Sequence, residues 1–410
     1  MEEAMGSEWL TAREAIARLR VKPQTLYAYV SRGLVHAERV PGTRTSRYAR
    51  ADVERLAART RGTTLPNAGP EVVVDSAVTL LDPTGHLYYR GWDATRAALE
   101  VSYEQIAEWL WESGASPSVW PAPEAALEVA RRTQAALPDT ATVPDRLRVV
   151  AAAIATCDPL RNDRRVPSVA ARSRGLIATL VDSLPVVHRS TGRRRDESIA
   201  ARLWPRISSA EPSPARVGAL NRALVLLADH ELAASTLAVR IAASTWADPY
   251  LLVVAGLATT GGPLHGGASE HVRRLLREIV DGSSPEAAIG ARLRESAVIP
   301  GFGHTVYRGP DPRAPVLLDA VRRARPRREI WTAATQVLDV VQREGGPHPN
   351  VDFALGVFAE ANDMVPGGGE AIFAVARCAG WIAHGLEEYP HRLRYRIRAA
   401  YTGAPPDVRI

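Results

Sequence analysis

Apolar residues recur at three- and four-residue spacing along most of the chain, a pattern typical of amphipathic helices. Beyond about residue 94, five segments show this pattern between Pro, Gly, Ser or Asp residues that begin or end helices. These segments are residues 103–113, 124–137, 145–157, 172–184 and 216–232. The sequence therefore predicts a large, mainly α-helical body.

Period-two alternation, which is typical of strands, is rare in this chain. It occurs on both sides of the Asp82-Pro83-Thr84-Gly85 segment, as VVVDSAVTLLD before it and HLYYRG after it. We predict two short strands joined by a turn here, ahead of the helical body.

The first 59 residues show a different pattern. Residues 11–20 place their apolar side chains on one helical face behind Thr11, which can cap the first turn. Pro23 suits the first position of a second helix, and Arg32-Gly33 ends that helix. A Pro41-Gly42 turn then separates two short extended segments, and a further helix begins near Ala49 or Ala51. This order predicts a winged helix-turn-helix over residues 1–59.

Residues 60–72 are rich in Gly, Pro, Thr and Asn and show no apolar periodicity, as in a linker. The chain has 410 residues, 46% of them hydrophobic and 23% charged, which is typical of a soluble globular protein with more than one core. Cys157 and Cys378 are too few for a disulfide framework. The acidic start has no leader pattern, and no apolar run is long enough to cross a bilayer, so we predict a cytoplasmic protein.

The positive charge is concentrated at the front of the chain. The whole chain carries a formal charge of +6, but Lys22 is its only lysine, so isolated arginines carry little information. Residues 9–48 contain eight basic and two acidic residues. This excess indicates a polyanionic partner for the front module.

Four segments place His, Asp, Arg and Gly where a helical core would not otherwise need them. They are ADHELAAST (228–236), GGPLHGGASE (261–270), IPGFGHTVYRGPDPRA (299–314) and NVDF (350–353). Together these segments resemble the citrate synthase family. The resemblance begins near Ser76 and extends to RIRAAYTG at residues 396–403.

The resemblance implies a mainly α-helical fold with two domains. The large domain comprises residues 73–267 and 357–410, and a small helical domain comprises residues 268–356 and closes over the site. In this family an arginine from the tail, here Arg396, reaches the site of a second subunit. A homodimer is therefore implied.

The resemblance also implies the chemistry, which is condensation of an acyl-CoA with oxaloacetate or a similar 2-oxo acid. A thioester methyl is a very weak acid, so a base and an oxygen-stabilising group must act together. Asp352 is the expected base, His265 the partner of the thioester oxygen, and His304 the donor to the ketone oxygen. The expected substrate ligands are His230, Arg313, Arg377 and Arg396, and Arg308 is the expected coenzyme A ligand. We expect no metal and no cofactor beyond the coenzyme A carried by the substrate.

The front module resembles the MerR/excisionase-like family through TLYAYVSRGL (25–34) and RTSRYARADVERL (44–56). Second helices of such modules enter the major groove of double-stranded DNA. The expected base or phosphate contacts are Gln24, Thr25, Tyr27 and Tyr29 from the helix, with Arg44 and Arg47 from the wing. The alternative is a docking or oligomerisation module that has kept this fold.

Several points stay open at the level of sequence. Four positions beside the site depart from the family pattern: Ser269, Ala233, Thr305 and the Gly309-Pro310 pair. They leave the acyl group and the 2-oxo acid open. Acetyl-CoA is the first expected substrate and propionyl-CoA the second. One alternative function is a ligand-sensing, DNA-binding regulator built on this scaffold. Another is an enzyme whose front module mediates assembly. We expect His271, His348 and His384 to be structural.

Overall fold

The computed structural model divides the chain into two compact units, Met1–Asp75 and Ser76–Ile410. Each has a hydrophobic core of its own. The residues that it describes are 9–19, 21, 23–31, 35–39, 45–54, 74–82, 85–115, 117–188, 197–262, 267–304, 306–307 and 309–395.

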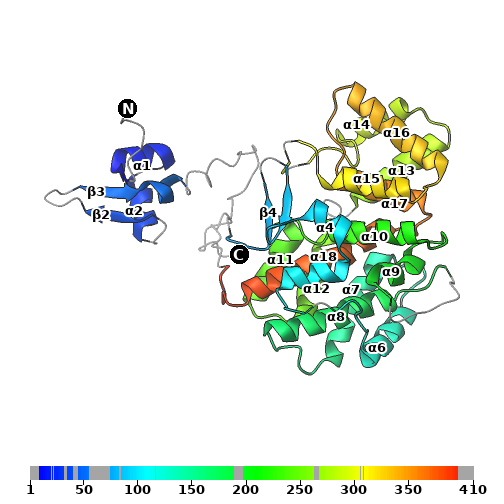
Figure 1. Ribbon diagram of the computed structural model, residues 1–410, viewed down its shortest axis with the longest axis horizontal. Helices are drawn as coiled ribbons and strands as arrows, with labels where there is room; N and C mark the ends of the chain where they lie inside the picture. Colours follow the sequence, from blue (N-terminus) through cyan, green and yellow to red (C-terminus); the bar gives the residue numbers. More distant parts are fainter. Residues whose placement is uncertain are drawn as a thin grey trace, which may run out of the picture. The chain divides into compact units, whose positions relative to one another are not determined.

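The described part of the first unit consists of helices and a three-stranded sheet (Figure 1). Its elements are β1 (Trp9–Thr11), α1 (Ala12–Leu19), α2 (Pro23–Ser31), β2 (Ala37–Arg39) and β3 (Ser46–Ala49), followed by helical residues at 50–54. The sheet is antiparallel with strand order β1-β3-β2. The two predicted helices, the two extended segments and the helical start near Ala49 or Ala51 are confirmed, whereas β1 was not predicted. The predicted Pro41-Gly42 turn lies outside the described residues.

Local sequence explains the start of this unit. The Thr11 hydroxyl accepts a hydrogen bond from the Glu14 N–H at 3.3 Å, and the Glu14 carboxylate accepts one from the Thr11 N–H at 2.8 Å. This reciprocal capping box stabilises the first turn of α1. Apolar residues from both helices and the sheet form the small core: Leu10, Ala15, Leu19, Leu26, Val35, Tyr48 and Val53.

The second unit begins with a small antiparallel sheet of order β4-β5-β6 and continues as helices. Its strands are β4 (Thr79–Leu81), β5 (Leu87–Tyr89) and β6 (Trp92–Asp93). The predicted pair of strands is confirmed, but the first is shorter than VVVDSAVTLLD, and β6 was not predicted. The Gly85 N–H donates to the Asp82 carbonyl at 2.9 Å in the turn between β4 and β5.

Most of the second unit is helical (Figure 1). The first helices are α4 (Ala94–Glu100), α5 (Tyr103–Trp111), α6 (Glu124–Ala135), α7 (Val143–Ile154) with the 3₁₀ turn η1 (Ala155–Cys157), α8 (Val166–Asp182) and α9 (Ile199–Ile207). They are followed by α10 (Pro214–Leu226), α11 (Ala234–Ser244), α12 (Pro249–Thr260), α13 (Ala268–Val280) and α14 (Pro285–Ser296). The last are α15 (Arg313–Arg323), α16 (Arg328–Arg343), α17 (Val351–Ala361) and α18 (Gly368–Glu388).

Helix α18 is the centre of the second unit. It is apolar on nearly every face and buried along most of its length, as expected for a helix surrounded by others. It packs against α5, α8, α10, α11 and α12. Polar side chains on such a helix must therefore find partners inside the protein.

Helices α13–α17 pack mainly against one another and gather at one end of the unit (Figure 1). They begin with the last residues of the GGPLHGGASE segment, and the chain then returns to α18 in the centre. The division into a large and a small domain at residues 268 and 356 stays a prediction, because the second unit is compact as a whole. No helix in the described part of the chain combines the length and apolar character needed to cross a membrane.

One predicted helix is too long. The pattern over residues 216–232 suggested a helix through Leu232, but α10 ends at Leu226 and α11 starts at Ala234. The connecting segment contains Asp229 and His230, and Glu231 has a positive φ of 53°. The helical periodicity therefore continues into a segment whose backbone turns away from the helix.

Candidate active site

Three rings from two separate connections meet in the second unit. His230 lies between α10 and α11, while His304 and Tyr307 lie ahead of α15. The ring centroids of His230 and His304 are 5.1 Å apart, and those of His304 and Tyr307 are 4.7 Å apart. His230 Nε2 lies 3.1 Å from the Tyr307 hydroxyl. Two of the predicted histidines are thus neighbours.

The backbone around His304 selects its tautomer. His304 Nδ1 accepts hydrogen bonds from the Val306 N–H at 3.0 Å and the Tyr307 N–H at 3.3 Å. A neutral imidazole that accepts at Nδ1 carries its proton on Nε2. Burial, followed by the positive charge of Arg313, lowers the pKa of His304 below its ordinary value of 6.5. His304 is therefore a neutral donor at pH 7.

The same environment acts on the neighbouring rings. Burial, followed by the charges of Arg313 and Arg377, holds the pKa of His230 well below its ordinary value. Burial also raises the pKa of Tyr307 to about 12, although Arg313 opposes that rise. The rings are neutral near pH 7, and the positive charge beside them comes from arginines.

Arg313 begins α15 and is held by Asp311 through two parallel hydrogen bonds. Its Nε donates to Asp311 Oδ1 at 2.9 Å and its Nη2 to Asp311 Oδ2 at 2.8 Å. Burial alone would raise the pKa of Asp311, but the charge and hydrogen bonds of Arg313 lower it below its ordinary value. Asp311 Oδ2 also accepts the Val351 N–H at 2.9 Å, so this pair is joined to the start of α17.

Asn350 joins the segments that carry His304 and Asp352. Its side-chain oxygen accepts the Asp352 N–H at 3.0 Å and so caps α17. Its amide nitrogen donates to the Gly303 carbonyl at 2.8 Å, and its backbone N–H donates to the Gly301 carbonyl at 2.9 Å. The two predicted catalytic segments, about fifty residues apart in sequence, are therefore hydrogen-bonded to each other.

Arg377 is buried on α18, 2% exposed, and differs from Arg313 in its partners. Its Nε donates to the Leu227 carbonyl at 2.9 Å, and its Cζ lies 4.6 Å from the centre of the Phe373 ring. Among the residues that the structure describes, no carboxylate forms an ion pair with it. Burial lowers its pKa, while the negative charges of Asp229 and Asp352 oppose that shift. A buried cation without an ion pair is suited to an anionic ligand.

Two clefts lie beside the GGPLHGGASE segment. One is lined by Gly267, Ala268, His271, Ser296, Val298, Ile299, Pro300, Gly301, Phe302 and Asn350. The other has a volume of about 380 Å³ and is lined by Thr142, Pro144, Arg148, Leu257, Thr260, Gly261, Gly262, Gly267, Glu270, Arg274, Pro366, Gly367, Glu370, Phe373 and Ala374. Gly267 contributes to both. The clefts therefore border the described ends of the GGPLHGGASE segment, and the first also borders the segments of Gly301 and Asn350.

Some predicted residues lie outside the described part of the chain. They are His265, Arg308, Arg396 and Arg44, together with the side chain of Gln24. Sequence reasoning missed Tyr307 and Asn350, which act on the predicted histidines and on Asp352. It also missed the pairing role of Asp311. The signal for Asp311 was its position two residues before Arg313 in the DPR segment, which permits a local bidentate pair.

The predicted DNA contacts differ in their exposure. Tyr27 on α2 is 61% exposed, whereas Tyr29 packs against the core of the first unit and Thr25 is half-buried. Arg47 on β3 donates to Glu38 at 2.9 Å, and its Cζ lies 4.5 Å from the centre of the Trp9 ring. Among the predicted contacts on α2 whose side chains are described, Tyr27 is therefore the most accessible.

Two of the three catalytic candidates, His304 and Asp352, belong to segments that contact each other. His304 lies beside His230, and the segment that carries it is hydrogen-bonded to the one that carries Asp352. The distance from either residue to His265 lies outside what the structure describes. A donor, an acidic residue and two buried arginines in one region are suited to polarise an anionic carbonyl compound.

Comparisons with known proteins agree with this architecture. Residues 69–399 match the profile of the citrate synthase C-terminal domain, and residues 10–60 match that of the MerR helix-turn-helix family of regulatory proteins. Citrate synthase of Haloferax volcanii is 30% identical over 365 residues, covering 81% of this chain and 94% of the relative. A 2-methylcitrate synthase of Mycobacterium tuberculosis is 30% identical over 355 residues, covering 81% and 89%.

A solved structure shows the same fold. The crystal structure of citrate synthase from Thermotoga maritima superposes with a TM-score of 0.67 at 27% identity, covering 83% of this chain and 95% of that protein. The front unit has its own family profile. The chain therefore belongs to the citrate synthase family of acyl-transferring enzymes and carries a MerR-type helix-turn-helix module at residues 10–60.

Proposed function

We propose that this protein condenses an acyl-CoA with oxaloacetate or a similar 2-oxo acid and then hydrolyses the thioester. Acetyl-CoA, giving citrate, is the first candidate, and propionyl-CoA, giving 2-methylcitrate, is the second. Relatives with 30% identity carry both names. The observation that carries the proposal is the neutral donor His304 beside two buried arginines, Arg313 and Arg377. The segment of His304 is hydrogen-bonded to the segment of Asp352 through Asn350.

In the proposed first step, Asp352 removes a proton from the α-carbon of the acyl-CoA. His265 donates a hydrogen bond to the thioester oxygen, which gains negative charge. The α-carbon then attacks the ketone carbon of the 2-oxo acid. His304 Nε2–H donates to the ketone oxygen, so that the new alkoxide is protonated as the carbon–carbon bond forms.

Binding of the dicarboxylate is assigned to arginines. Arg377 supplies a guanidinium with no ion-pair partner among the described residues, and Arg313 supplies a positive charge fixed by Asp311. His230 orients the same substrate, and Arg396 of a second copy completes the set, which makes a homodimer part of the proposal. Arg308 would contact coenzyme A. Water then attacks the thioester carbonyl, and the products are the free acid and coenzyme A. We propose that these steps need no metal or further cofactor.

The test is release of thiol from acetyl-, propionyl- and longer acyl-CoAs in the presence of oxaloacetate. We expect turnover by the wild type and a fall of about 10²–10⁴-fold for Asp352→Ala, as when a positioned base is removed. Asp319→Ala is the matched control, because Asp319 lies on α15 and pairs only with Arg322 and Arg323 in the described structure. Equal activity of wild type and Asp352→Ala would contradict the assignment of the base.

The front module supports a second proposal, binding of double-stranded DNA. Its support is the MerR-type profile over residues 10–60 and the excess of basic residues there. Because phosphate contacts release counterions, the affinity for duplex should fall steeply with salt. If neither wild type nor Asp352→Ala releases thiol while both bind acyl-CoA, the regulator reading replaces the enzyme. Active enzyme without duplex binding would instead favour a module that mediates assembly.

A further inference from the structure

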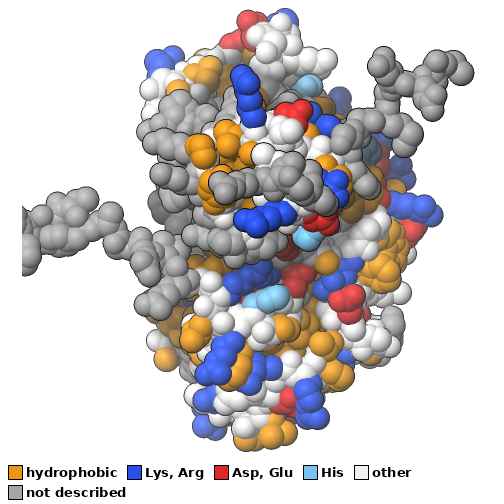
Figure 2. Space-filling model, turned by 90° about the vertical axis from the view of Figure 1, so that its left-hand side faces the viewer, with side chains coloured by type: hydrophobic (Ala, Val, Ile, Leu, Met, Phe, Trp, Pro, Cys, Tyr) orange, Lys and Arg blue, Asp and Glu red, His pale blue; other side chains and the backbone are white. Residues whose placement is uncertain are grey.

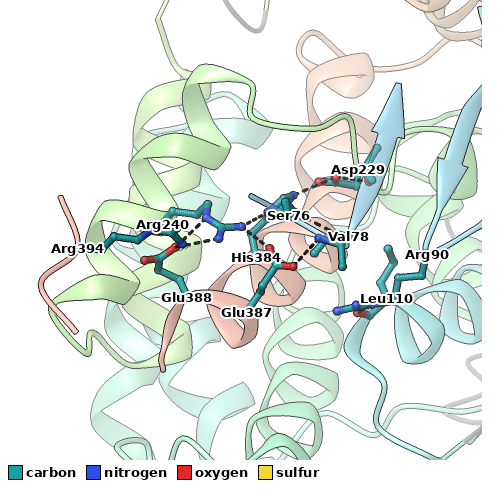
Figure 3. Close-up of polar contacts among 12 residues, drawn as sticks. Ser76, Val78, Arg90, Leu110, Asp229, Arg240, His384, Glu387, Glu388 and Arg394 are labelled. Atoms are coloured by element: carbon teal, nitrogen blue, oxygen red, sulfur yellow. Dashed lines mark hydrogen bonds and ion pairs between the residues drawn. The ribbon is translucent and has the colours of Figure 1, made fainter. Parts of the chain in front are cut away.

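A chain of buried polar side chains crosses the second unit beside the candidate site. It contains Asp229 between α10 and α11, Arg240 on α11, and His384, Glu387 and Glu388 near the end of α18 (Figure 3). Arg240, His384, Asp229 and Glu388 are all fully buried. Burial of ionisable groups is unfavourable unless they are paired. Here they pair with one another.

The contacts specify the direction of the hydrogen bonds. Arg240 Nη1 lies 2.9 Å from His384 Nδ1, and His384 Nε2 lies 3.1 Å from Asp229 Oδ2. Arginine can only donate, so His384 Nδ1 must accept, and its proton is on Nε2, directed at Asp229. Gly380 allows this approach, because a Cβ there would lie 2.2 Å from Asp229 Oδ1.

The inner end of this chain reaches the candidate site. Asp229 immediately precedes His230, and the Thr79 hydroxyl donates to Asp229 Oδ2 at 2.6 Å. Burial alone would raise the pKa of Asp229, but its interactions with His384, Arg377 and Thr79 keep it below the ordinary value. Its negative charge in turn supports the charge of Arg377 without forming an ion pair with it. Among the described residues, none accepts a hydrogen bond from the other N–H groups of Arg377, which leaves these groups for a ligand.

The outer end holds the start of the C-terminal tail. Glu388 Oε2 accepts from Arg240 Nε at 2.9 Å and from the Tyr395 hydroxyl at 3.0 Å, and it lies 3.6 Å from Arg394 Nη1. Arg240 Nε also donates to the Tyr395 hydroxyl at 3.2 Å. The next residue is Arg396, the proposed ligand in the site of a second copy.

We propose that Arg240, His384 and Asp229 form a positioning relay that holds His230 in place, leaves Arg377 available for the dicarboxylate, and anchors the tail at Tyr395. The inference rests on the proposed function, because the ligand whose binding it controls is oxaloacetate. None of the three residues contacts the reacting atoms. Each acts by orienting a neighbour.

The central test compares two substitutions of His384. Gln can accept from Arg240 through its carbonyl and donate to Asp229 through its amide, whereas Leu can do neither. We expect His384→Leu to weaken oxaloacetate binding at least tenfold and to lower kcat/KM for oxaloacetate by up to about 10²-fold, the scale of a misplaced ligand group. We expect His384→Gln to stay within about threefold of wild type and the KM for acyl-CoA to change little in either variant.

His188→Leu is the matched control, because His188 pairs with Glu211 away from this chain of contacts. Oxaloacetate affinity is measured by calorimetry, and turnover is measured by thiol release. Absence of turnover by the wild type would contradict the proposed function but not the relay. Equal losses in His384→Leu and His384→Gln, or no loss in either, would overturn the relay. Thermal unfolding of each variant shows whether it is folded.

The outer end is tested by a milder change, since His384→Leu removes one hydrogen bond from each of two buried charged groups, Arg240 and Asp229. Tyr395→Phe removes only the hydroxyl that bridges Arg240 and Glu388. We expect a several-fold rise in the KM for oxaloacetate with kcat nearly unchanged. Tyr250→Phe removes a comparable hydroxyl that donates to Asp158 at 3.1 Å and should leave both constants as in wild type. A Tyr395→Phe variant indistinguishable from Tyr250→Phe would overturn the anchoring of the tail.

Discussion

Arg313 and Arg377 are both almost fully buried, but they are compensated in different ways. Arg313 shares two hydrogen bonds with Asp311, whereas no described carboxylate pairs with Arg377. Removing one partner of a buried ion pair strands the other charge, which is strongly destabilising, whereas removing an unpaired buried charge is not. The two arginines should therefore respond oppositely to the same substitution.

We predict that Arg377→Leu raises the KM for oxaloacetate by at least about 10²-fold, because a charge-assisted pair of hydrogen bonds is lost. Its free energy of unfolding should equal or exceed that of wild type. Arg313→Leu should instead lose about 3–5 kcal/mol, because Asp311 is left buried and unpaired. Urea unfolding of both variants provides the measurement. Destabilisation of Arg377→Leu as large as that of Arg313→Leu would show that Arg377 is paired in the folded protein.

The histidines lead to a prediction about pH. Burial, followed by the charge of Arg313, lowers the pKa of both His230 and His304 in the folded state, while the unfolded chain keeps values near 6.5. Below pH 6.5 the unfolded state thus binds more protons, and the free energy of unfolding should fall as the pH falls towards the folded pKa values. The acid limb of kcat/KM should likewise lie below pH 6.5.

Urea unfolding and thiol release at several pH values between 5 and 8 test this prediction. In His304→Gln the fall of stability on acidification should be smaller, because one titrating group is gone. His188→Gln serves as a control for loss of a histidine outside the site. An acid limb of activity centred above pH 6.5 would mean that neither buried histidine controls it.

At the scale of elements, the site depends on a turn that fits against the start of α17. Gly301 has a φ of 79°, and a Cβ there would lie 2.7 Å from the Phe353 Cα and 2.8 Å from a Val272 methyl carbon. The same turn carries the carbonyl that accepts the Asn350 N–H. Any side chain at residue 301 must therefore push apart the segments of His304 and Asp352.

We predict that Gly301→Ala lowers stability by about 1–3 kcal/mol, because a strained φ is imposed on a non-glycine residue. It should also lower kcat/KM at least tenfold, because the donor and the base move apart. Gly290→Ala on α14 is the control. Gly290 is helical, and its nearest neighbour is the flexible end of Arg294 at 3.5 Å, so alanine should be neutral or stabilising by up to about 1 kcal/mol. Similar effects of the two substitutions would refute this account of the turn.

At the scale of the whole molecule, the two units have separate cores and separate family profiles. The described groups proposed for condensation all lie in the second unit. Side chains of both signs are interspersed with apolar ones on the face seen in Figure 2, so the net charge is not gathered into one patch there. The excess of basic residues over residues 9–48 is the charge pattern on which the proposed polyanionic partner rests.

We predict that removal of residues 1–70 leaves kcat for thiol release within about twofold of the full chain, because the second unit keeps its own core. The same truncation should abolish duplex binding. Duplex binding by the full chain should weaken as salt is raised, which is measured by titration of labelled DNA between 50 and 200 mM salt. A truncated chain that is folded but inactive would show that the first unit contributes to catalysis.

Local sequence determined much of this protein. Helical periodicity, capping residues and turns placed α5, α6 and α7 within about three residues of their observed ends, because these signals act between neighbours along the chain. The winged module was predicted for the same reason, down to the Thr11 cap. The resemblance to the family also singled out His230, His304, Asp352, Arg313 and Arg377 as candidates for the site.

Only the tertiary structure decided how these residues meet. The end of α10 at Leu226 could not be predicted, because apolar periodicity continues past it into the segment of Asp229 and His230. His384 was expected merely to pack, but burial obliges it to find polar partners, and these come from α11 and from the segment before it. The lack of an ion pair between Arg377 and any described carboxylate likewise depends on groups distant in sequence. Hydrogen bonding and burial are properties of three-dimensional neighbours, which no linear pattern specifies.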